Sequence, residues 1–166
     1  MPSRTDFSEM TCSIARAWDV IGEPWTPLIL RDLAIGVRRF ELLRQDLGVS
    51  TNVLASRIRV LEDHGVVRRE PYREGGRTRE EYVLTQMGAE LVPVLAAVMS
   101  WGDRWLSPGG APAEVLHESC GGCGVSASVV CGDCGEPLLA EDMRFRRGPG
   151  GAAGPGTQII GALDPS

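Results

Sequence analysis

The sequence predicts a mainly α-helical fold that contains one small β-hairpin and is followed by a small cysteine-rich module. Apolar residues recur at helical spacing between residues 12 and 65 and again between 86 and 105. Between them, residues 66–84 change to a strand-like pattern around a Gly-Gly pair. Four of the five cysteines form two C-x-x-C-G motifs. We therefore expect a helical domain with a hairpin, and a separate module behind it.

The first two predicted helices have recognisable start and stop signals. An apolar run at helical spacing ends at Gly22. Thr26 then offers a capping hydroxyl, and Pro27 needs no amide partner at the first helical position. A second helix therefore begins there and ends near Gly36. Residues 1–11 are polar, and we expect them to be flexible.

A third and a fourth helix follow, separated only by a short turn. The third helix ends at Gly48, and Ser50 can cap the fourth. Leu54, Ile58 and Leu61 then form one apolar face of the fourth helix. Two helices of this size with this spacing are typical of a helix-turn-helix motif.

A hairpin is predicted after the fourth helix. Residues 66–70 and 81–84 have strand-like patterns, and they bracket the polar segment PYREGGRTRE at 71–80, which we expect to be a flexible basic loop. The order of a helix, a helix-turn-helix and a two-stranded hairpin is that of a winged helix-turn-helix domain, with the hairpin as its wing.

The remaining chain divides into a helix, a linker, a module and a tail. Thr85 can cap a long apolar helix that extends to about residue 106, and Pro93 inside it predicts a bend or a break. Residues 107–113 form a Pro- and Gly-containing linker, and 114–147 hold the cysteine pairs. Residues 148–166 are rich in Gly, Pro and Ala, which predicts disorder.

The charge distribution is compatible with binding to nucleic acid. The net charge is −5, but the segment between residues 28 and 79 holds eleven arginines against seven acidic residues. All 17 basic residues of the chain are arginine, a side chain that suits contacts to phosphate and guanine. Charge alone leaves DNA binding open.

A family resemblance is carried by three segments within residues 12–106: CSIARAWDVIGEPWTPLILRDLAIGVRRFELLR, LGVSTNVLASRIRVLEDHGVVRRE and EYVLTQMGAELVPVL. With these segments the sequence resembles the HxlR family of bacterial regulators. The resemblance implies a winged-helix homodimer that binds operator DNA and regulates genes in response to a metabolite or an oxidant. It favours repression.

Candidate DNA contacts lie in three places. The N-terminal side chains of a recognition helix read bases in the major groove. The hairpin arginines suit contacts to the minor groove or to the DNA backbone. Two arginines at the start of the third helix are placed for contact with phosphate. These candidates are Ser50, Thr51, Asn52, Ser56, Arg57 and Arg59; Arg73, Arg77 and Arg79; and Arg38 and Arg39.

We also expect a homodimer. The 86–105 segment has more apolar residues than one small domain needs for its core. Pairing this helix and the Trp18 helix with a second subunit would bury the excess and place two recognition helices about one DNA turn apart. The alternative is that Trp101 and Trp105 pack on the chain's own cysteine module.

The cysteine pairs predict a structural zinc site. Cys120, Cys123, Cys131 and Cys134 supply four thiolates, which suit tetrahedral Zn²⁺ at about 2.3 Å. Glycine after the second cysteine of each pair tolerates the conformation of a tight turn, and VSASVV between the pairs can form a hairpin. His117 could replace Cys123 as a ligand. Four protein ligands leave no open position for a reactive water, so the site would not be catalytic.

Cys12 is a candidate redox sensor. It lies at the start of the first predicted helix, where the resemblance places a sensing cysteine in some members, and a helix N-terminus favours the reactive thiolate. The alternatives are a small residue that fills space at the dimer interface, and a small-molecule effector that binds between the long helix and the DNA-binding core.

Two further function classes are alternatives to a regulator. One is a zinc-ribbon adaptor whose winged helix contacts proteins. The other is an enzyme, which we do not expect because the sequence has no His-rich open metal site and no thioredoxin-like βαβ pattern. No secretory signal and no apolar run of membrane-spanning length is present, so we expect a cytoplasmic location and no membrane contact.

Overall fold

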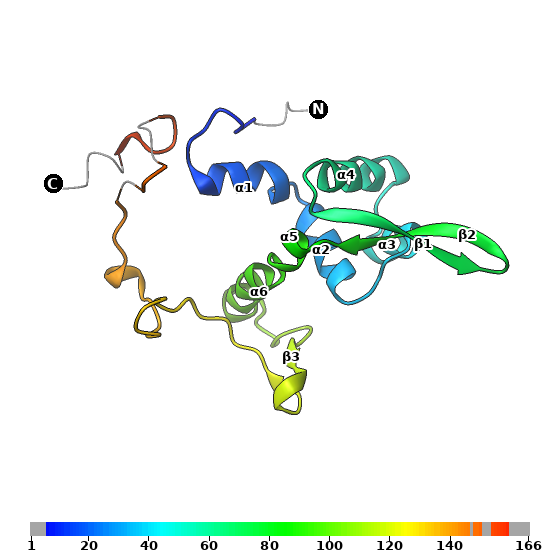
Figure 1. Cartoon of the computed structure of the whole chain (residues 1–166). Helices are drawn as coiled ribbons and strands as arrows, with labels where there is room; N and C mark the ends of the chain where they lie inside the picture. Colours follow the sequence, from blue (N-terminus) through cyan, green and yellow to red (C-terminus); the bar gives the residue numbers. More distant parts are fainter. Residues whose placement is uncertain (1–5, 147, 151–153, 160–166) are drawn as a thin grey trace. The chain divides into compact units, whose positions relative to one another are not determined.

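The computed structural model describes residues 6–146, 148–150 and 154–159, in two compact units. One unit is formed by residues 28–138, and the other by the described residues up to 27 together with those from 139. Figure 1 shows the ribbon of the chain. Among the described residues, no helix combines the length and the apolar character that crossing a membrane requires.

The helix-turn-helix is formed as predicted. Helix α2 covers Thr26–Ala34, α3 covers Phe40–Leu47, and α4 covers Thr51–Asp63. The Ser50 hydroxyl accepts a hydrogen bond from the Val53 amide and so caps α4. The apolar face of α4 packs into a core whose side chains are almost inaccessible to solvent: Ile29, Leu30, Leu43, Leu54, Ile58, Leu61 and Val66.

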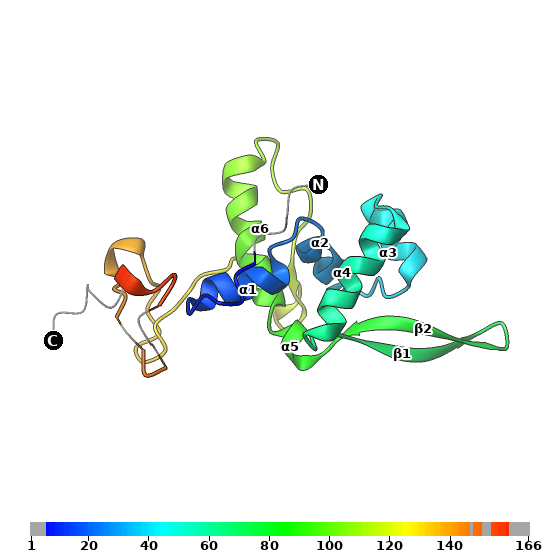
Figure 2. The ribbon, with the colours of Figure 1, turned by 90° about the horizontal axis from the view of Figure 1, so that it is seen from above.

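The hairpin is longer than predicted. Strand β1 (Val67–Glu74) pairs antiparallel with β2 (Arg77–Leu84) in a continuous register from Val67↔Leu84 to Glu74↔Arg77. The expected flexible loop at 71–80 is therefore wrong: only Gly75 and Gly76 form the turn. Both glycines have positive φ, as a type I′ turn requires, and this turn matches the twist of the two strands. The hairpin projects beyond the helices in both ribbon views (Figures 1 and 2).

The predicted break in the long helix is confirmed. The structure has a short helix α5 (Gln86–Ala89) and then α6 (Val92–Leu106), with Pro93 in the first turn of α6, where it needs no amide partner. Thr85 caps α5 by accepting a hydrogen bond from the Gly88 amide. No residue of α6 is buried in the single chain.

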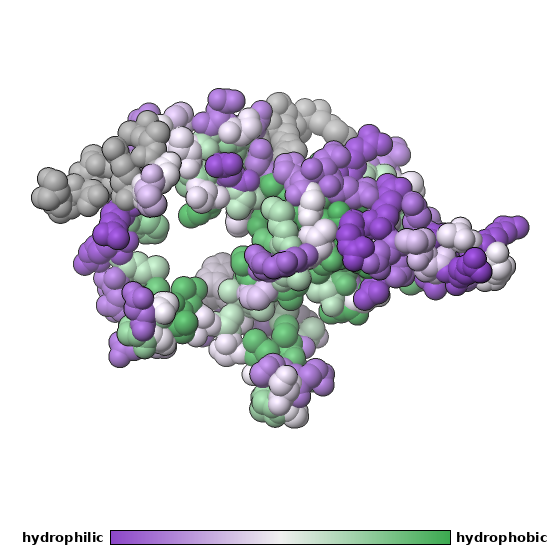
Figure 3. Space-filling model, in the orientation of Figure 1, coloured by the Kyte–Doolittle hydropathy of each residue, from purple (hydrophilic) through white to green (hydrophobic). Residues whose placement is uncertain are grey.

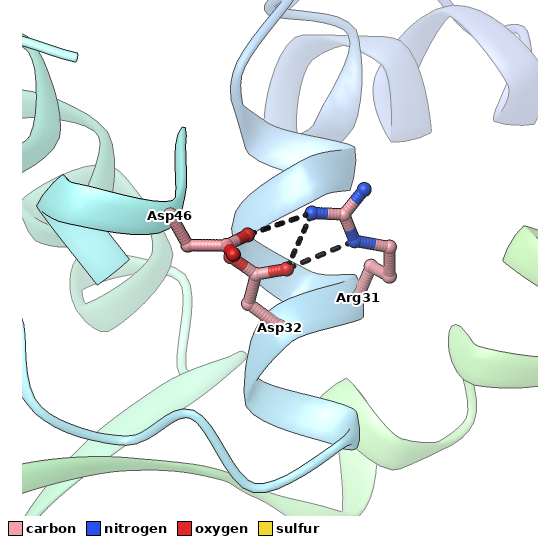
Figure 4. Close-up of polar contacts among 3 residues, drawn as sticks. All are labelled: Arg31, Asp32 and Asp46. Carbon is pink, nitrogen blue, oxygen red and sulfur yellow. Dashed lines mark hydrogen bonds and ion pairs between the residues drawn. The ribbon is translucent and has the colours of Figure 1, made fainter. Parts of the chain in front are cut away.

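Asp32 is a buried acidic residue in this core. Its side chain on α2 is fully inaccessible, and Arg31 binds one of its oxygens through Nε at 2.9 Å and Nη2 at 2.6 Å (Figure 4). Arg31 Nη2 also lies 3.2 Å from Asp46 Oδ2 on α3, so one guanidinium joins the two helices. Asp32 Oδ2 has no hydrogen-bond partner among the described residues.

The first helix belongs to the other unit. Helix α1 covers Ser13–Ile21 and begins after Cys12. The segment before it contacts residues 154–157: the Thr11 amide donates to Pro155 O at 3.1 Å, and the Thr11 and Thr157 hydroxyl oxygens lie 2.5 Å apart. Parts of the segments expected to be flexible, 1–11 and 148–166, thus form contacts; residues 1–5, 151–153 and 160–166 lie outside the described residues.

Candidate nucleic-acid interface

The N-terminal edge of α4 presents short polar side chains to solvent. Thr51, Asn52 and Ser56 are exposed, Arg59 is exposed one turn further on, and Arg57 is half-buried. Because Leu54 and Ile58 hold the opposite face of the helix in the core, this edge is rigidly presented. An α-helix fits the major groove, where Asn pairs with adenine and Arg with guanine. The edge therefore has the geometry of a recognition helix.

The hairpin carries three exposed arginines near its turn. Arg73 lies opposite Thr78, Arg77 opposite Glu74, and Arg79 opposite Tyr72. These side chains stand on paired strands and not on a loose loop, so their spacing along the hairpin is fixed. Figure 3 shows hydrophilic residues gathered over α4 and the hairpin.

Arg38 and Arg39 join the start of α3 to the hairpin. The Arg38 carbonyl accepts a hydrogen bond from the Tyr82 amide at 2.8 Å, and the Arg38 guanidinium lies 3.5 Å from Glu81. Arg39 pairs with Glu74. Both arginines therefore lie beside the hairpin, and each already has a carboxylate partner.

Arg69 is a structural residue that sequence reasoning missed. Its guanidinium binds both oxygens of Glu62 near the end of α4, at 2.7 and 3.1 Å, and Glu80 on β2 at 3.1 Å. These hydrogen bonds raise the pKa of Arg69 further above its ordinary value. The guanidinium also lies 5.5 Å from the ring centre of Tyr82, whose pKa is raised by burial. Arg69 thus fixes the hairpin against the recognition helix.

The candidate arginines differ in their ion pairs. Arg38, Arg39 and Arg79 each face a glutamate. Within the part of the chain that the structure describes, Arg59, Arg73 and Arg77 form no ion pair with an acidic side chain. These last three can meet an anion without first losing a partner.

Each cysteine pair forms its own tight turn. The amides of Cys134 and Asp133 donate to the Cys131 sulfur and lower the pKa of that thiol. Gly135 has a φ of 74°, as expected for glycine after the second cysteine, whereas Gly124 lies in a short strand. In the other pair, a hydrogen bond with the Cys123 side chain lowers the pKa of Cys120. Amides that donate to sulfur stabilise the thiolate, the form that binds metal.

The two pairs are not brought together. No group of three or more His, Cys, Asp or Glu side chains that could hold a metal ion occurs in the described ranges. The expected hairpin through VSASVV is wrong, because each pair closes on its own neighbours. Strand β3 (Leu116–His117) pairs with β4 (Cys123–Gly124), and Val130 bridges Pro137. His117 on β3 lies directly opposite Cys123 on β4. The two residues that the sequence offers as alternatives for one metal ligand are therefore cross-strand neighbours.

Cys12 lies at the N-cap of α1 and is half-buried. Its carbonyl accepts the first helical hydrogen bond, from the Arg16 amide. Gly156 packs against it so closely that an added Cβ would lie 2.9 Å from the Cys12 Cβ. The segment around residue 156 therefore covers part of the Cys12 side chain at its Cβ.

The fold and the site define a winged helix-turn-helix domain with a recognition helix and a basic wing. The family model described as HxlR-like helix-turn-helix matches residues 20–109. The chain therefore belongs to the HxlR family, which confirms the resemblance of the sequence.

Three similar proteins extend this result. Rv3095 of Mycobacterium tuberculosis, an uncharacterised HTH-type transcriptional regulator, is 39% identical over 139 residues, 83% of this chain and 87% of that protein. The structure of PA1607, a candidate transcription factor, is 37% identical with a TM-score of 0.77 and covers 87% of this chain and 100% of its own. The redox regulator HypR, in its oxidised form, is 28% identical with a TM-score of 0.50, covering 56% of this chain and 96% of its own.

The relatives are described as regulators, which favours a transcriptional regulator over the adaptor. The match to Rv3095 spans 139 of the 166 residues and must include both cysteine pairs, wherever it begins. The similarity thus extends through the segment that follows the winged helix.

Proposed function

We propose that this protein is a transcriptional repressor that binds double-stranded operator DNA as a homodimer. The observation that carries the proposal is the exposed polar edge of α4 beside a basic hairpin, in a domain of the HxlR family. Asn52, Arg57 and Arg59 would read bases with help from Ser50, Thr51 and Ser56, and the hairpin arginines would contact the backbone. The enzyme alternative has no support from the relatives.

Dimerisation is proposed from the surface of α6. Val94, Val98, Trp101 and Trp105 are each about half exposed or more and follow each other at helical spacing. A stripe of this kind on one helix is typical of an association surface. Trp18 on α1 is exposed as well and is a second candidate for contact with the other subunit.

Paired arginine variants test the DNA contact. Arg73→Ala removes a hairpin arginine that pairs with no acidic side chain among the described residues, whereas Arg68→Ala removes one on the same strand that pairs with Glu70. Binding to the DNA upstream of the protein's own coding sequence would be titrated over a salt series. We expect Arg73→Ala to weaken binding and to reduce the salt slope by about 1, with Arg68→Ala close to wild type. Equal effects, or no DNA binding by the wild type, would contradict the proposal.

The effector is proposed to be an oxidant that acts at Cys12, or a small molecule. The support is the position of Cys12 at the start of α1 and the similarity to the redox regulator HypR. Peroxide treatment followed by non-reducing electrophoresis tests the first option. We expect a covalent dimer that has lost DNA affinity and that does not form in Cys12→Ser. If peroxide leaves DNA binding unchanged, the effector is instead a small molecule.

A structural Zn²⁺ is proposed at Cys120, Cys123, Cys131 and Cys134. The support is the tight turn of each pair, the backbone amides that donate to the Cys131 sulfur, and the preference of four thiolates for zinc. The ion would tie the pairs together and fold this segment around itself. Native mass spectrometry of wild type and of Cys131→Ser should give one zinc per chain and a loss of zinc, respectively. A metal-free wild type would refute the site.

A further inference from the structure

Glu74 on the hairpin lies between two of the arginines that we expect to contact DNA. Arg39 Nη1 is 2.6 Å from Glu74 Oε1, and Arg79 Nη1 is 3.4 Å from Glu74 Oε2. Each carboxylate oxygen thus binds one guanidinium. The Arg39 guanidinium also stacks at 4.7 Å from the ring centre of Tyr72, which orients it toward the hairpin. The three charged side chains have a net charge of +1.

The same three side chains line an open groove. The groove has a volume of about 300 Å³ and lies between the start of α3 and the hairpin, with Phe40 and Tyr72 as its aromatic lining. The exposed fractions are 44% for Arg39, 57% for Arg79 and 41% for Glu74. Since both guanidinium groups reach solvent, an external anion can approach them without a change of the backbone.

A DNA phosphate has the chemistry to replace this carboxylate. Both groups present oxygen acceptors that guanidinium binds with charge-assisted hydrogen bonds. Ion pairs between exposed side chains are weak, so they exchange readily. Arg73 and Arg77, further toward the turn, have no such partner among the described side chains and need no exchange. Glu74 therefore distinguishes Arg39 and Arg79 from Arg73 and Arg77.

We infer that Glu74 occupies the phosphate-binding position of Arg39 and Arg79 in the free protein and is displaced by a backbone phosphate when DNA binds. This inference rests on the proposed DNA-binding function. Glu74 then weakens binding, because its ion pairs must be broken and its charge stays close to the phosphate. It also reduces the salt dependence, because it takes the place of a solution anion at the two arginines.

A matched pair of variants tests the inference. Glu74→Gln and Glu70→Gln make the same change on the same strand, but Glu70 pairs with Arg68 and not with Arg39 or Arg79. Binding to the upstream DNA would be measured over a salt series. We expect Glu74→Gln to bind about five- to tenfold more tightly at low salt, with a slope steeper by about 1, and Glu70→Gln to stay within about twofold of wild type.

A double-mutant cycle separates displacement from general repulsion. The gain from Glu74→Gln should largely disappear in an Arg39→Ala/Arg79→Ala background. A gain that persists there, or one no larger than that of Glu70→Gln, would overturn the inference while leaving DNA binding intact. Failure of the wild type to bind would instead overturn the proposed function. Should Glu74→Gln fold poorly, Glu74→Asp replaces it, because the shorter side chain draws the carboxylate away from Arg39 and should give an intermediate gain.

Discussion

Asp32 is a buried carboxylate that holds the guanidinium joining two helices of the DNA-binding unit. It is fully buried on α2, and Arg31 bridges it to Asp46 on α3 (Figure 4). Burial raises the pKa of Asp32 above its ordinary value of 3.8, and the Arg31 guanidinium counteracts only part of that rise. The guanidinium that contacts Asp46 is thus held by a carboxylate whose ionised form is disfavoured by burial.

The pH dependence of stability tests this feature. A carboxyl group with a raised pKa in the folded state binds more protons folded than unfolded, so its contribution to stability falls as the pH rises through and above 3.8. Asn does not titrate. We therefore expect the free energy of unfolding of Asp32→Asn, relative to wild type, to rise between pH 4 and pH 7 in denaturant titrations. A difference that stays constant or falls over this range would contradict the prediction.

Features that depend on neighbouring residues can be predicted from the sequence, whereas ion pairs between distant residues cannot. The Ser50 cap and the buried face of Leu54, Ile58 and Leu61 follow from local spacing. Glu74 and Arg69 were missed because their roles depend on ion pairs across elements, such as the pair between Arg39 and Glu74, 35 positions apart. The hairpin holds four glutamates among five arginines, so the sequence alone does not single out Glu74.

At the scale of elements, the helices were easier to predict than the hairpin. Helical periodicity is repeated over several turns, whereas Pro71 and the charged residues beside it have no strand-like pattern. Pro71 nevertheless lies in β1 opposite Glu80, because a two-stranded sheet has only edge strands and a proline can leave its nitrogen facing outward. The Gly-Gly turn sets the register that the side chains alone do not reveal.

Gly88 fixes the junction between the hairpin and α5. A Cβ on this residue would lie 2.3 Å from the Val66 carbonyl oxygen, which already accepts hydrogen bonds from Thr85. Gly88→Ala must therefore displace α5, and we expect the free energy of unfolding to fall by about 1–3 kcal/mol. Met87→Ala, on the exposed side of the same helix, should change it by less than about 0.5 kcal/mol. Equal values in denaturant titrations at one protein concentration would refute this close contact.

At the scale of the whole molecule, the exposed face of α6 predicts the oligomeric state. Val98 is 57% exposed and lies in the stripe proposed to meet a second subunit. A charge there would be buried without a partner in the dimer, so Val98→Glu should give a monomer in sedimentation and weaken operator binding by tenfold or more. Ile35→Glu, at an exposed apolar residue outside α6, should remain a dimer. Dimeric Val98→Glu would exclude this face as the interface.

The cysteine module marks a limit of prediction at this scale. Sequence spacing predicts the tight turn of each pair, because only a few residues are involved. Whether the pairs meet depends on closing the segment between them, and the metal that would supply the energy for this is not encoded in the local pattern. The zinc measurement therefore decides a question that neither periodicity nor turn chemistry can answer.

The contacts of Thr11 bear on the order in which parts of the chain can fold during synthesis. Its partner Pro155 lies 144 positions later in the chain. At translation rates of about 5–20 residues per second, on the order of ten seconds pass between the synthesis of Thr11 and that of Pro155. The hairpin and the recognition helix have by then left the ribosome, so the DNA-binding unit can fold first. A nascent or truncated chain that stops before residue 154 would carry this unit while Cys12 still lacks the cover of Gly156.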